Sequence, residues 1–203
     1  MRIEEEIKLD YSDVLFRPKR STLKSRKDVD LNRKYTFKHS RSSWKGIPII
    51  ASNMDGVGEI DVAKKLSSHK LMTALTKQHD INQIGTIYKK NIFFDSIALS
   101  CGTSKESYNR LNSILKKYPK FKFICIDVAN GYSENFSNFV SEVRKKYPKK
   151  TIIAGNVVTA DMTQELVLSG ADIVKVGIGP GSVCTTRIQT GVGYPQLSAV
   201  MEC

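Results

Sequence analysis

The feature of this sequence that most constrains its fold is a regular alternation of short apolar segments with longer amphipathic ones. The apolar, β-branched segments predict strands at 47–51, 71–75, 96–100, 123–127, 151–154 and 172–176. Apolar residues at helical spacing between them predict helices at 60–68, 106–118, 134–147 and 162–169. The repeat is about 25 residues long, which is the length of one strand, one helix and two short loops.

About six successive βα units with no antiparallel hairpin signal between them indicate a parallel sheet. A doubly wound sheet and a TIM (β/α)8 barrel are both built from such units. No GxGxxG follows the first predicted strand, which disfavours a dinucleotide-binding doubly wound fold. Polar residues and glycines follow nearly every predicted strand, as in the ring of functional loops of a barrel. We therefore expect an α/β protein with an incomplete TIM barrel of about six βα units.

The sequence divides into two predicted parts. Residues 1–45 are polar and loop-like, with short strands predicted near 29–31 and 35–37, and we expect them to form an N-terminal arm that packs on the barrel. Residues 46–203 hold the six βα units and end in a helix that begins near Gln196. The last strands of a TIM barrel commonly build its phosphate site, so we expect the 203-residue chain alone to be inactive.

Charge and composition argue against several functional classes. The net charge of +12 raises the question of a nucleic-acid partner, but the lysines are distributed along the whole chain and indicate a solvated surface instead. No apolar run approaches the roughly 20 residues of a membrane helix, and the N-terminus lacks the apolar centre of a signal peptide. We expect a cytoplasmic protein with no membrane or nucleic-acid partner. None of the four cysteines has CxxC spacing, so zinc is not expected.

The segment 174–187, VKVGIGPGSVCTTR, carries the strongest chemical signal. Its glycines allow the backbone to approach a bound ion closely, and Ser182 can bind a phosphate oxygen. Cys184 follows in the same polar loop, where the charge of Arg187 and backbone N–H donors favour the thiolate that a nucleophile needs. From local composition alone, a loop cysteine without a chemical role is an equally good interpretation.

Several segments together resemble the IMP dehydrogenase/GMP reductase family. They are GIGPGSVCTTR with IVKV before it and GYPQLSAV after it, and the earlier LDYSDVLFRPKRSTLKSR, FKHS, PIIASNMD, CIDVANGYSE and TIIAGNVVTADM. The resemblance covers essentially the whole chain and implies a TIM-barrel oxidoreductase. Only residues 76–95 separate the second and third predicted strands, so the CBS domains that dehydrogenases of the family usually insert there are absent. This absence favours the reductase branch.

The resemblance implies NADPH-dependent reductive deamination of GMP to IMP, with release of ammonia. Cys184 would attack C2 of the purine to form a thioimidate, and Thr186 would assist the departure of ammonia. The carboxylate partner of Thr186 is expected beyond residue 203. The family also implies a homotetramer. Two alternatives remain open, namely an IMP dehydrogenase without CBS domains and an inactive truncated remnant.

The resemblance also implies binding residues at the matching positions. Those expected to bind the cofactor are Ser25, Arg26, Lys77, Asp127, Val128, Ala129, Ile178 and Gly179. Those expected to bind the purine nucleotide are Ser52, Met54, Asn156 and Ser182. A potassium site is expected at Gly179, Gly181, Cys184 and Arg187. Two positions depart from the family pattern, since Gly56 stands where a threonine is expected and Thr76 and Gln78 flank Lys77 in place of histidines.

Overall fold

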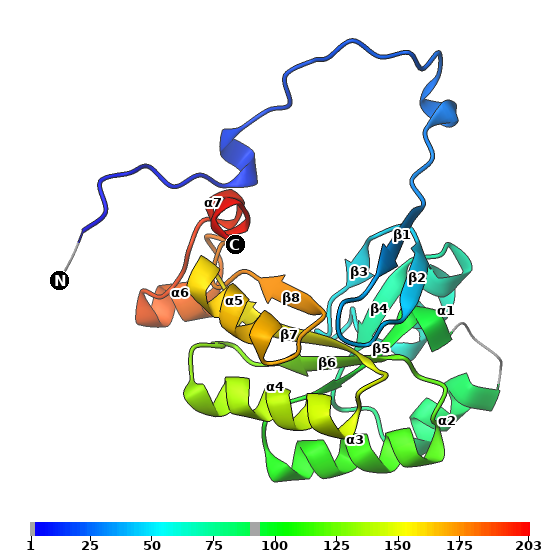
Figure 1. Ribbon diagram of the computed structural model, residues 1–203. Helices are drawn as coiled ribbons and strands as arrows, with labels where there is room; N and C mark the ends of the chain where they lie inside the picture. The colour runs from blue at the N-terminus through cyan, green and yellow to red at the C-terminus, as the bar shows by residue number, and fades with distance from the viewer. Residues whose placement is uncertain (1–2, 90–93) are drawn as a thin grey trace.

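A parallel six-stranded sheet forms the centre of the molecule, seen in a computed structural model that describes residues 3–89 and 94–203. Its strands are β3 (Ile50–Ala51), β4 (Met72–Leu75), β5 (Ile97–Cys101), β6 (Phe123–Asp127), β7 (Thr151–Val157) and β8 (Ile173–Val176). Each strand pairs with the next one along the chain, whereas a doubly wound sheet reverses its order partway. The sheet curls into part of a barrel (Figure 1), which confirms the predicted fold class.

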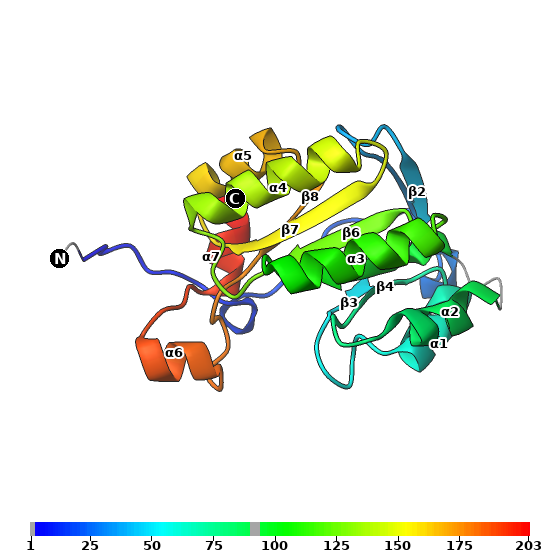
Figure 2. The ribbon, with the colours of Figure 1, turned by 90° about the horizontal axis from the view of Figure 1, so that it is seen from below.

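The helices cover the outer face of this curled sheet (Figure 2). They are α1 (Ile60–Ser68), α2 (Ile81–Lys89), α3 (Lys105–Lys117), α4 (Glu134–Lys146) and α5 (Ala160–Leu168), while α6 (Thr185–Thr190) and α7 (Gln196–Glu202) follow β8. Each outer helix buries one apolar stripe, as an amphipathic sequence requires. In α3 that stripe is Tyr108, Leu111, Ile114 and Leu115. The main core therefore lies between these helices and the outward-facing side chains of the sheet.

A small hairpin closes the opposite, inner face at the amino ends of the strands. It consists of β1 (Arg33–Thr36) and β2 (Ser43–Gly46), paired antiparallel. Phe37 and Trp44 are buried against inward-facing residues of the sheet, and the Phe37 ring meets the Phe123 ring edge-on at a centroid distance of 5.7 Å. The strand predicted near 35–37 thus overlaps β1. The strand predicted near 29–31 was wrong, because Val29 and Leu31 lie exposed in an extended segment outside the hairpin.

The described residues before the hairpin form an extended arm that includes the short 3-10 helices η1 (Tyr11–Asp13) and η2 (Arg26–Asp28) (Figure 1). The arm is held to the start of α7, where the Leu9 N–H donates to Ser198 Oγ at 2.8 Å and the Gln196 N–H donates to Asp10 Oδ1 at 2.7 Å. The predicted boundary at residue 45 falls inside β2. The division into an arm and a barrel therefore stays a prediction.

Helix α2 is an element that the strand-and-helix pattern did not predict. Its start is fixed by Asp80, whose Oδ1 accepts hydrogen bonds from the backbone N–H groups of Asn82 and Gln83 at 2.7 and 2.8 Å. Gln83 Oε1 accepts in return from the Asp80 N–H at 2.8 Å, which completes a capping box. The helices that were predicted begin and end within about two residues of the observed bounds.

Candidate active site

The loops at the carboxyl ends of β3 to β8 meet around three adjoining hollows. The first, of about 280 Å³, lies among the ends of β3, β6, β7 and β8, and two others of about 450 and 830 Å³ extend it toward β4 and β5. Asp127 lines all three hollows, so they form one continuous face. Function in a TIM barrel resides at this end of the strands, which makes the face the candidate active site.

Cys184 stands beside this face at the N-cap position of α6. The chain reaches it from β8 through Gly177 and Gly179, which have φ values of 139° and 53° that glycine adopts without strain. Backbone hydrogen bonds from Arg187 and Thr186, aided by the Thr186 hydroxyl and the Arg187 charge, lower the pKa of the Cys184 thiol from its ordinary value. The thiol is half-buried and accessible, so its environment suits a nucleophile.

The two cysteines within the sheet, Cys101 and Cys125, have thiol pKa values that are raised instead of lowered. Burial raises the pKa of the Cys101 thiol to about 12 and that of the Cys125 thiol to about 11. Both side chains are buried in strands, where thiols behave as small apolar groups. The thiolate form is therefore favoured at Cys184 and disfavoured at these two core cysteines.

The cysteine loop brings some of its expected residues to the face and leaves others outside. Thr186, Ile178 and Gly179 line the hollow of about 280 Å³. Ser182 is exposed on the outer part of the loop and does not line that hollow. Gly181 has open space on the side where a side chain would stand.

Strands β3, β6 and β7 supply most of the remaining predicted residues. Ser52, Met54, Asp127, Val128, Ala129 and Asn156 all line the hollow of about 280 Å³. The loop after β6 is tied to β7 by backbone hydrogen bonds, since the Val128 N–H donates to the Gly155 carbonyl at 2.9 Å and the Asn156 N–H donates to the Val128 carbonyl at 3.0 Å. Asn156 Nδ2 donates to the Gly177 carbonyl at 2.9 Å and so links β7 to the start of the cysteine loop.

Lys77 is exposed between the two larger hollows and lines both. The loop that carries it is held from behind by buried His79, whose Nε2 lies 3.3 Å from a Glu59 carboxylate oxygen. Arg110 of α3 donates to the backbone carbonyls of His79 and Ser100. The loop after β4 is therefore anchored to its neighbours on both sides.

Lys175 is a residue of this face that the sequence interpretation missed. Its Nζ donates to Asn53 Oδ1 at 2.9 Å and to Asp127 Oδ1, and so joins the ends of β3, β6 and β8. Within the motif VKVGIGPGSVCTTR the lysine lies inside a strand, where local composition gives no sign of its role. Strand alternation and the pairing of neighbouring strands are the signals that could have identified it.

Ser25 and Arg26 are not brought to this face. They lie in the exposed arm, where Ser25 caps η2 by accepting a hydrogen bond from the Lys27 N–H at 3.2 Å. Their predicted role in binding a cofactor stays a prediction.

The potassium prediction also stays untested. The Gly181 carbonyl already accepts a hydrogen bond from the Cys184 N–H at 3.1 Å, and Arg187 donates to the Pro180 carbonyl at 3.2 Å. In this conformation the positively charged Arg187 guanidinium therefore already lies against a backbone carbonyl of the loop in which a potassium ion was predicted. Among residues 3–89 and 94–203, no three His, Cys, Asp or Glu side chains gather to hold a metal ion.

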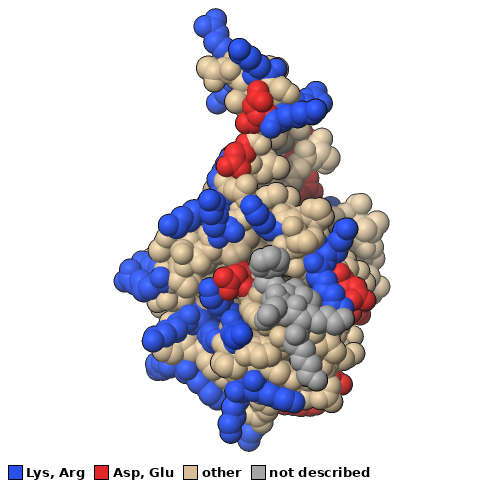
Figure 3. Space-filling view, turned by 90° about the vertical axis from the view of Figure 1, so that its right-hand side faces the viewer, with Lys and Arg blue, Asp and Glu red and all other residues tan. Residues whose placement is uncertain are grey.

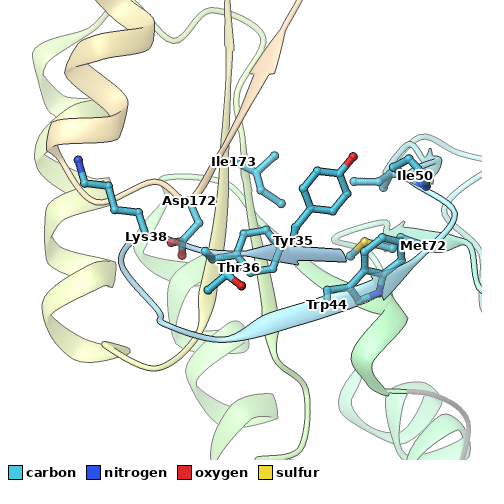
Figure 4. A pocket seen from close by; sticks show the side chains of 10 residues that line it. Tyr35, Thr36, Lys38, Trp44, Ile50, Met72, Asp172 and Ile173 are labelled. Carbon is cyan, nitrogen blue, oxygen red and sulfur yellow. The ribbon is translucent and has the colours of Figure 1, made fainter. Parts of the chain in front are cut away.

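A separate apolar hollow of about 420 Å³ lies at the amino ends of the strands, under the hairpin (Figure 4). Its wall is mostly apolar and aromatic, with Tyr35, Trp44, Ile50, Met72 and Ile173 pointing toward the space. The Asp172 carboxylate at its edge is fully occupied by donors from the protein. We place the candidate active site elsewhere, because this hollow lies at the amino ends of the strands and not at their carboxyl ends.

Basic side chains are prominent on part of the surface. On the side seen in Figure 3, Lys and Arg side chains gather over much of the left and lower parts, and acidic side chains stand in smaller groups among them. The helices in the described part of the chain are all too short or too polar to cross a membrane. The prediction of no nucleic-acid partner is untested by these observations.

Comparison with known proteins identifies the family. The sequence model described as "IMP dehydrogenase / GMP reductase domain" matches residues 8–203. GMP reductase from Yersinia enterocolitica is 57% identical over 205 residues, and GMP reductase from Escherichia coli K12 is 56% identical; each match covers 100% of this chain. The crystal structure of inosine 5' monophosphate dehydrogenase from Legionella pneumophila superposes with a TM-score of 0.83 at 29% identity, covering 97% of this chain and 59% of that one.

The chain spans 59% of the length of these GMP reductases. Over that span the match includes the cysteine loop, the polar ends of the strands and the curled parallel sheet. The chain therefore belongs to the IMP dehydrogenase/GMP reductase family.

Proposed function

We propose that the protein catalyses the NADPH-dependent reductive deamination of GMP to IMP, with release of ammonia. The observation that carries this proposal is the accessible Cys184 thiol with a lowered pKa at the N-cap of α6, two residues before Thr186 of the hollow. The relatives of similar sequence that are named GMP reductase support the reductase over the dehydrogenase.

In the proposed mechanism, the Cys184 thiolate forms a bond from Sγ to C2 of the purine. The bond from C2 to the 2-amino group breaks, and the nitrogen leaves as ammonia after receiving a proton through Thr186. A thioimidate on Cys184 results. NADPH, when bound, supplies the hydride that reduces C2, and the Sγ–C2 bond then breaks to return the thiolate and release IMP.

The residues around the hollow of about 280 Å³ are suited to hold the purine nucleotide. We propose that Ser52, Met54, Asn156 and Ser182 bind GMP. The hollow is polar at the β7 end, where the position of Asn156 is fixed by its bond to Gly177. Ser182 lies outside the hollow and would reach a phosphate only at its rim.

The larger hollows offer basic side chains to an anionic dinucleotide, beside the acidic Asp55, Glu106 and Asp127 that also line them. The hollow of about 830 Å³ is lined by Lys77, Arg110 and the first turn of α3, and Gly102 leaves its wall open because no atom stands within 4 Å of a Cβ there. We propose that Lys77, Asp127, Val128, Ala129, Ile178 and Gly179 bind NADPH, with Ser25 and Arg26 contributing from the arm.

The test is the loss of NADPH absorbance when GMP is added to the full-length protein. We expect oxidation that requires GMP and disappears in Cys184→Ala, whereas the matched variant Cys203→Ala keeps it. Mass spectrometry of the digested protein after a GMP quench should find the nucleotide adduct on Cys184. An adduct on another cysteine, or full turnover by Cys184→Ala, would contradict the mechanism.

A second candidate is an IMP dehydrogenase without CBS domains, favoured by the structural match to the Legionella enzyme. It uses the same thiol chemistry in the direction of oxidation. NADH formed from IMP, with no NADPH consumed in the presence of GMP, would establish it. Absence of both activities in the 203-residue chain would support the third alternative, an inactive truncated remnant.

We further propose a homotetramer, a potassium requirement and a cytoplasmic location. The exposed apolar side chains of the arm support self-association, since Leu15 and Phe16 are 99% and 103% exposed in the single chain. Light scattering measures the oligomeric state. Comparing turnover in potassium and in tetramethylammonium salts tests the cation, which would involve Gly179, Gly181, Cys184 and Arg187.

A further inference from the structure

Lys175, Gly155 and Asp127 stand in one row across three neighbouring strands. In the parallel pairing, Asp127 of β6 lies opposite Gly155 of β7, and Gly155 lies opposite Lys175 of β8. The two charged residues are thus two strand spacings apart, which is roughly 9.6 Å across a sheet. Only a long side chain can bridge that distance, and it does so only if the strand between them leaves room.

Gly155 leaves that room. A Cβ atom built at this position would lie 2.5 Å from Lys175 Cβ and 2.5 Å from the Lys175 carbonyl oxygen. Strand β8 therefore approaches β7 closely at this point, and from there the Lys175 side chain reaches Asp127 Oδ1 and also Asn53 Oδ1 at 2.9 Å. Any larger residue at 155 would clash with Lys175 and displace it.

The row faces the inside of the incomplete barrel. On β6 the side chains of Phe123 and Cys125 belong to the inner core, and Asp127 follows them at the same two-residue period. On β8, Ile173 packs on that inner core and Lys175 comes two residues later. The lysine and the aspartate therefore occupy the inward layer nearest the active face, where an ordinary barrel core has apolar side chains.

Placing a charged pair in this layer costs desolvation free energy that an apolar pair would not cost. The Lys175 and Asp127 side chains are only 25% and 33% exposed, so each charge is partly desolvated and depends on the other. Asp127 lines all three hollows, and Asn53 lines two of them. Lys175 thus holds two polar side chains at the point where the proposed nucleotide and cofactor positions adjoin.

We propose that Lys175 is a positioning residue, which fixes the Asp127 carboxylate and the Asn53 amide for contact with the bound nucleotides and neutralises the aspartate beside those anions. This inference rests on the proposed function. Lys175 acts through Asp127 and Asn53 and takes no part in the bond-making steps at C2.

The experiment compares Lys175→Met with Lys175→Arg and with the matched surface control Lys145→Met, all in the full-length protein. Affinity for NADPH is measured by its fluorescence, affinity for IMP by calorimetry, and kcat and KM by absorbance. We expect Lys175→Met to weaken NADPH binding by about tenfold or more and to reduce kcat/KM by on the order of 100-fold, as misplacement of a contacting group does. Lys175→Arg retains charge and reach and should recover most of the NADPH affinity, while Lys145→Met should match the wild type.

A double-mutant cycle with Asp127→Asn separates positioning from a general effect on folding. If Lys175 acts through Asp127 and Asn53, its removal weakens NADPH binding by much less in the Asp127→Asn background than in the wild type, because only the effect through Asn53 remains. Losses that multiply would overturn the inference, as would unchanged affinities in Lys175→Met. A lowered Tm with unchanged nucleotide affinity would also overturn it, because a purely structural role predicts that pattern.

The two proposals fail in different ways. If the wild type binds NADPH and IMP but oxidises no NADPH with GMP, the proposed reaction is wrong, and the affinity comparison still decides the role of Lys175. If the wild type binds neither nucleotide, both proposals are wrong.

Discussion

Replacing Asp172 by asparagine should destabilise the fold far more than an isosteric change normally does. The side chain is fully buried and accepts four hydrogen bonds from two sides. Oδ1 accepts from the backbone N–H groups of His39 and Ser40 at 2.8 and 3.2 Å. Oδ2 accepts from the Arg144 guanidinium at 2.7 Å and from the Ile152 N–H at 3.2 Å. This carboxylate joins the hairpin turn, β7 and α4 at one point.

The size of the effect follows from the number of donors. An asparagine has one oxygen and one NH2 group, so in either orientation its NH2 group faces two donors that the carboxylate satisfied. Leaving a buried donor unpaired costs about 1–3 kcal/mol, and removing one member of a buried ion pair costs about 3–5 kcal/mol. Arg144 keeps partners in the Gly170 and Lys150 carbonyls, at 2.9 and 2.7 Å, which reduces the loss. We therefore expect about 3 kcal/mol.

Calorimetry at fixed protein concentration measures this change, because the Tm of an oligomer depends on concentration. For a domain of this size, about 3 kcal/mol corresponds to a decrease in Tm of roughly 6–12 °C. Asp30→Asn, in the exposed arm, is the control and should change Tm by less than about 2 °C. A decrease in Tm of similar size in both variants, or none in Asp172→Asn, would refute the idea that the Asp172 carboxylate holds the hairpin turn, β7 and α4 together.

Three further experiments test other parts of the structure. The rate at which iodoacetamide labels Cys184 should have its pH midpoint below the ordinary thiol pKa, because the lowered pKa makes thiolate available at lower pH. Cys101 and Cys125 should stay unlabelled in the native protein, and peptide mass spectrometry at several pH values measures the labelling of each cysteine. Gly155→Ala should cost about 1–3 kcal/mol by overpacking and weaken NADPH affinity with it, and unchanged affinity would contradict the row of side chains described above. Phe37→Ala should cost about 3 kcal/mol by calorimetry if the hairpin is part of the core, and less than about 0.5 kcal/mol if it is not.

Much of the barrel could be predicted because each unit carries its own signal. The strand 123–127 and the helix 60–68 were predicted with the bounds that the structure has. A buried parallel strand needs a continuous apolar run, and an outer helix needs one apolar face, so both leave clear patterns. Helix α2 was missed although Asp80 and Gln83 form a capping box in the sequence, since its nine residues follow a loop without a glycine or proline boundary.

The arm was harder to predict, because its conformation has few local determinants. Val29 and Leu31 alternate with polar residues as in a strand, yet they pair with no strand among the residues that the structure describes. Strand pairing is a non-local property, and β-branched residues alone do not provide it. The positions of Ser25 and Arg26 relative to the active face depend on the same non-local contacts, so sequence resemblance can suggest their role but local patterns cannot place them.

The active face shows the same division between local and non-local information. Cys184 stood out in a glycine-rich polar loop, and the family resemblance supplied the roles predicted for it and for Thr186, whereas Lys175 was passed over inside a strand. Its partner Asp127 lies 48 positions away in the sequence, and the glycine that lets them meet lies on the strand between. Once the parallel register is known, Asp127, Gly155 and Lys175 are seen to lie opposite one another on three neighbouring strands. The glycine then helps to identify the pair, because it has no side chain to separate the two charged residues. A charged residue at an inward position of a barrel strand is best examined together with the residues opposite it on the next two strands, because its partner is to be found there.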